Sequence, residues 1–158
     1  MASKFSKPWV INLAMIVALI GIVAIGQQFS PLLLPRADVT GTAEPGCDLQ
    51  KRPCKASLPE GGLLELSITP RPIPFLQALR VEVTVTGLKP RKVAVDFAGA
   101  SMNMGYNRSE LAATSPGLYA AEASLPVCVS GGMSWVATVM IETDRQQIAV
   151  PFRFDTGH

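Results

Sequence analysis

An apolar segment near the amino end places the strongest constraint on how this chain can fold. It runs for 18 residues from Trp9 to Gly26, and Asn12 is its only strongly polar residue. As a helix it would be about 27 Å long, close to the roughly 30 Å of a bilayer's hydrocarbon core. Lys4 and Lys7 precede it, so the positive-inside rule predicts a cytoplasmic N-terminus and a remainder across the membrane. We therefore expect a single membrane-spanning helix.

A cleavable signal peptide is the alternative, because residues 24–26 (Ala-Ile-Gly) form a small-x-small cleavage pattern. The apolar run is longer than the roughly 7–15 residues of a signal core, which favours the anchor. Both interpretations put the rest of the chain outside the cytoplasm. The expected organisation is a cytoplasmic tail (1–8), a transmembrane helix (9–29), a proline-containing linker (30–46) and an extracytoplasmic β-sandwich domain (47–156).

Beyond the linker, apolar and polar residues alternate with the period of half-buried β-strands. Six or seven short strands without a helical period predict an all-β fold, an antiparallel sandwich of immunoglobulin-like kind. Trp135 is expected in its core, with a ligand-shielding or partner-contacting role as the alternative. The runs cover residues 64–68, 79–85, 93–97, 119–125, 135–141 and 148–154, with a further short strand near Leu111.

Charge and composition argue against two classes of function. The net charge is only +2 and no run of Lys or Arg exceeds two residues, so nucleic-acid binding has no electrostatic basis. The only histidine is His158, the last residue. We therefore expect neither a Ser-His-Asp triad nor a histidine-based metal site, and we expect that the protein is not an enzyme.

Two of the three cysteines bound a short segment. Cys47 and Cys54 bound a loop of eight residues that includes both cysteines, and outside the cytoplasm such a pair most simply forms a disulfide. A reversible dithiol that binds metal or exchanges electrons is the alternative. The spacing is wider than the Cys-x-x-Cys of redox sites, which favours the structural bridge.

Four sulfur side chains fall in two Gly-containing breaks between the predicted strands. We name these breaks the first sulfur segment (residues 101–108) and the second sulfur segment (residues 126–135). Met102 and Met104 lie in the first, and Cys128 and Met133 lie in the second. Thioethers and a thiolate select copper(I) over harder cations, so these four residues are the candidate metal ligands. The alternative for each is packing, since a free cysteine also behaves as a small hydrophobe.

Short motifs in and near these segments resemble the FixH/YtkA-like family. They are residues 102–105 (Met-Asn-Met-Gly), 117–119 (Gly-Leu-Tyr), 125–126 (Leu-Pro) and 132–135 (Gly-Met-Ser-Trp), within a resemblance over roughly residues 60–154. The resemblance implies a single-pass protein of the bacterial inner membrane with a C-terminal periplasmic β-sandwich. It also implies copper handling and assembly of haem-copper respiratory oxidases.

The expected function is therefore that of a membrane-anchored periplasmic copper(I)-binding protein. Such a metallochaperone would assist metal delivery to, or assembly of, a respiratory oxidase. Its partners would be the inner membrane and an oxidase subunit or another copper-handling protein. The alternative is a metal-free accessory or assembly module, whose helix docks in the bilayer while the sandwich binds a partner.

Overall fold

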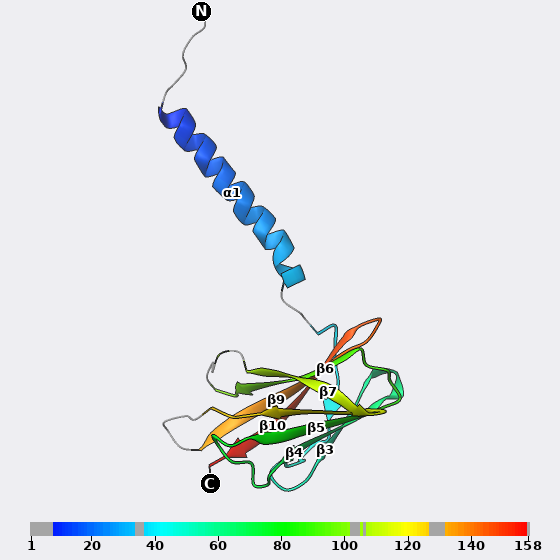
Figure 1. The fold of residues 1–158 in the computed structure, drawn as a ribbon. Coiled ribbons are helices and arrows are strands. Elements are labelled where there is room, and N and C mark those ends of the chain that lie inside the picture. Colours follow the sequence, from blue (N-terminus) through cyan, green and yellow to red (C-terminus); the bar gives the residue numbers. More distant parts are fainter. Residues whose placement is uncertain (1–7, 34–36, 102–104, 106, 127–131, 158) are drawn as a thin grey trace, which may run out of the picture. The chain divides into compact units, whose positions relative to one another are not determined.

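The chain divides into two units, Met1–Arg36 and Ala37–His158. A computed structural model describes residues 8–33, 37–101, 105, 107–126 and 132–157 (Figure 1). The described part of the first unit is one helix, and the regular structure of the second is β-strand apart from one short 3-10 turn. The prediction of a mostly β protein preceded by one N-terminal helix is therefore confirmed.

Helix α1 (Pro8–Leu33) contains the apolar segment. It begins at a proline, which suits a first helical position because no intrahelical acceptor awaits its missing N–H. Its large apolar side chains are exposed on all sides, each by 39–67% between Trp9 and Ile25. Counted over the described residues alone, the chain has no helix long and apolar enough to cross a membrane. The membrane-spanning segment therefore stays a prediction.

Ten strands form one continuous, barrel-like sheet in the order β1-β10-β9-β6-β7-β8-β5-β4-β3-β2 (Figure 1). All but one of the pairings are antiparallel, and the exception is β1, which runs parallel to β10. One 3-10 turn, η1 (Pro59–Gly61), precedes β4. The strands are β1 (Val39–Thr40), β2 (Thr42–Ala43), β3 (Cys54–Ser57), β4 (Leu63–Thr69), β5 (Leu79–Thr86), β6 (Lys92–Gly99), β7 (Arg108–Ser115), β8 (Leu118–Ala123), β9 (Met133–Glu142) and β10 (Gln147–Thr156).

Strand β7 and the extended stretch made of β1 and β2 turn corners and so join the two layers of the sheet. The first half of β7 pairs with β6, and its second half pairs with β8. β1 and β2 are successive pieces of one extended stretch, of which β1 pairs with β10 and β2 pairs with β3. This stretch therefore connects the two ends of the strand order.

Gly41 is the corner between β1 and β2. Its N–H donates to the carbonyl oxygen of Ala149 at 2.9 Å. A Cβ built at this position would lie 2.8 Å from a methyl group of Val150 and 3.1 Å from the carbonyl oxygen of Ser57. The close approach of both layers explains why a residue without a side chain stands here.

The core lies between the two layers and is built mainly by residues that alternate along the strands. Along β9, the buried positions are every second residue from Met133 to Ile141. Trp135 is completely buried, as expected of a core residue. Residues 37–46 lie in the second unit and contain β1 and β2.

Candidate functional site

The described ends of the two sulfur segments meet at one end of the barrel. The N–H of Ala100, just before the first segment's methionines, donates to the carbonyl oxygen of Ser134 in the second segment at 2.9 Å. The neighbouring pair, Gly99 and Trp135, is in register between β6 and β9. The strand pairing of β6 with β9 therefore brings these two flanks together.

A second contact joins the opposite flanks. The side-chain amide of Asn107 donates to the carbonyl oxygen of Ser124 at 3.2 Å, and the carbonyl oxygen of Asn107 accepts the N–H of Phe97 at 2.9 Å. Asn107 precedes β7 and Ser124 follows β8. The ends of β6 and β8 and the beginnings of β7 and β9 thus form one rim of the barrel (Figure 1).

Three of the four candidate ligands, Met102, Met104 and Cys128, lie outside the described residues. Met133 was expected in a turn, but it is the first residue of β9. Its side chain is 8% exposed and belongs to the core cluster. Met133 lies two residues before Trp135. Extending the predicted alternation from Trp135 back to Met133 would therefore have placed Met133 on the inward face as well.

A buried polar contact holds the backbone beside Met133. The indole N–H of Trp135 donates to Thr156 Oγ1 at 3.0 Å, and the Thr156 hydroxyl donates to the carbonyl oxygen of Met133 at 3.2 Å. Thr156 is 2% exposed. Because each buried polar group has a partner, the contact fixes the start of β9 against the end of β10 at the rim.

The expected disulfide is confirmed. Cys47 and Cys54 are joined, with their Cα atoms 5.7 Å apart. The loop that they enclose (the disulfide loop, residues 47–54) is also held by its own contacts. Leu49 is completely buried, and its carbonyl oxygen accepts the Nε–H of Arg71 at 3.3 Å.

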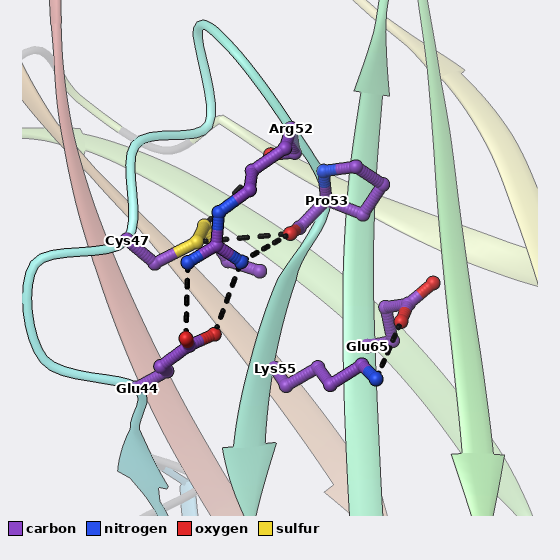
Figure 2. A network of polar contacts seen from close by, with 7 residues as sticks. Glu44, Cys47, Arg52, Pro53, Lys55 and Glu65 are labelled. Carbon is purple, nitrogen blue, oxygen red and sulfur yellow. Dashed lines mark hydrogen bonds and ion pairs between the residues drawn. A yellow bond between two sulfur atoms is a disulfide. The ribbon is translucent and has the colours of Figure 1, made fainter.

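An exposed ion pair clamps the outer side of the disulfide loop. Figure 2 shows the Arg52 guanidinium in front of the disulfide, donating to both oxygens of Glu44 at 2.9 and 3.2 Å. This bond lowers the pKa of Glu44 and raises that of Arg52. The pKa of Asp48 is also lowered, first by the hydrogen bond from the backbone N–H of Gln50 and then by the hydrogen bond from the Lys51 side chain. These carboxylates therefore stay charged at neutral pH and take part in holding the loop.

A cleft of about 800 Å³ lies beside the disulfide loop. Residues from three segments line it: 46–51, 72–77 and 153–157. Gln50 links all three, because its side-chain amide donates to the carbonyl oxygen of Asp155 at 2.5 Å and its side-chain oxygen accepts the N–H of Ile73 at 2.6 Å. No local pattern in the sequence indicates this cleft, because its lining comes from three separate segments.

No three side chains of His, Cys, Asp or Glu gather as a metal site in the part of the chain that the structure describes. The chain matches no protein-family model, no curated protein and no solved structure.

Proposed function

We propose that this chain is a membrane-anchored, extracytoplasmic protein that binds copper(I) through Met102, Met104, Cys128 and Met133. The observation that carries the proposal is the pair of hydrogen bonds that ties the described flanks of both sulfur segments to one rim of the barrel. Segments that leave the same rim start within reach of each other. Three thioethers and one thiolate are a ligand set that suits copper(I) and disfavours zinc or hard cations.

Copper is the cargo in this proposal, and no chemistry beyond ligand exchange is needed. The resemblance to the FixH/YtkA-like family suggests that the copper is delivered to a haem-copper respiratory oxidase during its assembly. On the same resemblance, we assign the β unit to the immunoglobulin-like class of β-sandwich. An anchor in the same membrane as the acceptor raises the effective concentration of the donor without any new contact.

The anchor itself is supported by the side chains of α1. Apolar residues lie on all sides of this helix between Trp9 and Ile25, which is typical of a segment buried in lipid or in a larger assembly. In spheroplasts of a bacterial host, an added protease should digest the β unit without lysis. Digestion only after lysis would place the β unit in the cytoplasm and contradict the proposed localisation.

Copper binding is tested on the full chain in detergent micelles, titrated with copper(I) against a competing chelator. We expect one ion per chain. Met102→Ala/Met104→Ala and Cys128→Ser should each weaken binding by more than about tenfold, or about 1.4 kcal/mol. Met133→Leu removes the sulfur while nearly conserving volume, so it tests ligation apart from packing. Met140→Leu, on the same strand but away from the rim, is the matched control.

If the unmodified chain binds copper(I) and none of the four substitutions weakens that binding, the proposed ligand set is refuted. Failure of the unmodified chain to compete with the chelator would refute copper binding as a whole. The metal-free interaction module would then be the function that the sequence still supports.

A further inference from the structure

Strand β10 has one edge that is only partly paired. On one side β9 pairs with it along its whole length, from Gln147 to Thr156. On the other side β1 pairs only with Ile148 and Ala149. Among the described residues, no strand lies in register with this second edge after Ala149.

The hydrogen bonds along this edge show which residues of β10 direct their backbone N–H and C=O groups toward it. The carbonyl oxygens of Gln147 and Ala149 accept backbone N–H groups from the stretch of β1, at 2.8 and 2.9 Å. The carbonyl oxygen of Asp155 accepts the Gln50 side chain at 2.5 Å. Successive residues of a strand direct their N–H and C=O alternately to the two neighbouring strands. Arg153 therefore directs both its N–H and its C=O to the same open edge.

The space beside this stretch is a cavity rather than packed protein. The cleft of about 800 Å³ has Arg153 and Asp155 on one side and the disulfide loop on the other. A smaller cavity of about 290 Å³ continues past Pro151 and Arg153. Ile73 and Phe75 contribute apolar surface to the larger cleft. Unpaired strand groups and an apolar wall thus face the same space.

We propose that this cleft binds an extended segment of a partner polypeptide, which adds to β10 as a strand. The segment takes the position beside residues 151–155 that β1 occupies beside Ile148 and Ala149. Its C=O and N–H pair with the N–H and C=O of Arg153. The side chains that it directs into the cleft contact Ile73 and Phe75. Main-chain pairing gives affinity, and the apolar wall selects alternate side chains, as in other cases of strand addition.

The walls of the cleft favour a single extended chain over the sheet edge of a second copy. The disulfide loop opposite β10 is fixed by buried Leu49 and by the bridging Gln50. The sheet edge of a second copy carries the other layer of its own barrel on one face, and this layer does not fit between such walls. Charged side chains at Arg153 and Asp155 also oppose indiscriminate edge-to-edge pairing. This inference does not depend on copper binding.

The decisive substitution is Arg153→Pro, which removes the N–H that the partner segment needs. Pro151 faces the same edge two residues earlier, so the strand already accommodates a proline there. Arg153→Ala is the matched control, since it removes the charge but keeps the N–H. A randomised library of peptides of about ten residues, displayed on phage, is selected against the full chain in detergent micelles.

We expect enriched peptides that alternate apolar and polar residues and whose affinity falls more than about tenfold in Arg153→Pro. Arg153→Ala should stay within a few-fold of the unmodified chain. Hydrogen exchange on the unmodified chain gives a readout that needs no variant, because bound peptide should slow exchange at the Arg153 amide. The proposal is overturned if no peptide is enriched, if Arg153→Pro binds equally well, or if protection appears elsewhere. Copper titration of Arg153→Pro should match that of the unmodified chain.

Discussion

Replacing Trp135 by alanine should lower the free energy of unfolding by about 3–5 kcal/mol, the largest effect that we predict for this chain. Trp135 is completely buried between the two layers of the sheet. The substitution removes the whole indole from a core that cannot fill the space, and it also removes a hydrogen bond to Thr156. Folded domains are stable by only about 5–15 kcal/mol, so this loss is a large part of the total.

Two further variants separate packing from hydrogen bonding at this position. Trp135→Phe keeps most of the apolar volume and should cost less than the alanine. Thr156→Val keeps the shape of its side chain but leaves the buried indole N–H without an acceptor, which should cost about 1–3 kcal/mol. Urea denaturation of the full chain, followed by circular dichroism, measures all three. An unchanged midpoint for Trp135→Ala would contradict the packing of this core.

Removing the disulfide by Cys47→Ala/Cys54→Ala should cost about 2.5 kcal/mol, the value expected from the entropy of an eight-residue loop in the unfolded chain. The folded loop should keep its place, because Leu49 remains in the core and Gln50 remains bonded across the cleft. The loss therefore comes mainly from the unfolded state. Urea midpoints of the variant and of the unmodified chain, each with and without a reductant, measure it.

Glu44→Gln is the control for this loop. It breaks the exposed clamp to Arg52 but leaves the covalent link intact, and exposed ion pairs contribute little. Its midpoint should hardly move. If reduction of the unmodified chain shifts the midpoint no more than Glu44→Gln does, the disulfide contributes no measurable stability.

Periodicity predicted the strands whose side chains divide between core and solvent. The six alternating runs found in the sequence correspond to β4, β5, β6, β8, β9 and β10, because each is long enough for alternation to show, and the short strand expected near Leu111 corresponds to β7. β1, β2 and β3 have only two to four residues, too few to reveal a period. The pairing of β1 with β10 is parallel and departs from the antiparallel expectation, because β1 has only two residues and no local pattern shows which strand it pairs with or in which direction.

The candidate sites were less predictable than the fold. Sulfur chemistry selected four residues, but only Met133 lies within the described residues, and it continues the buried face of β9. The open edge of β10 had one local signal, Pro151 inside an alternating run, since proline in a strand is confined to edges. The cleft had none, because it arises from three segments that only the folded chain brings together.

The corner at Gly41 has a mechanical consequence. β1 is the first strand that the chain enters after the unit that contains α1, and its ladder with β10 is two residues long. A force applied through the N-terminal segment would therefore act first on the seam that closes the barrel. The two-residue pairing of β1 with β10 would therefore break before the ten-residue pairing of β9 with β10, and the barrel would open between β1 and β10.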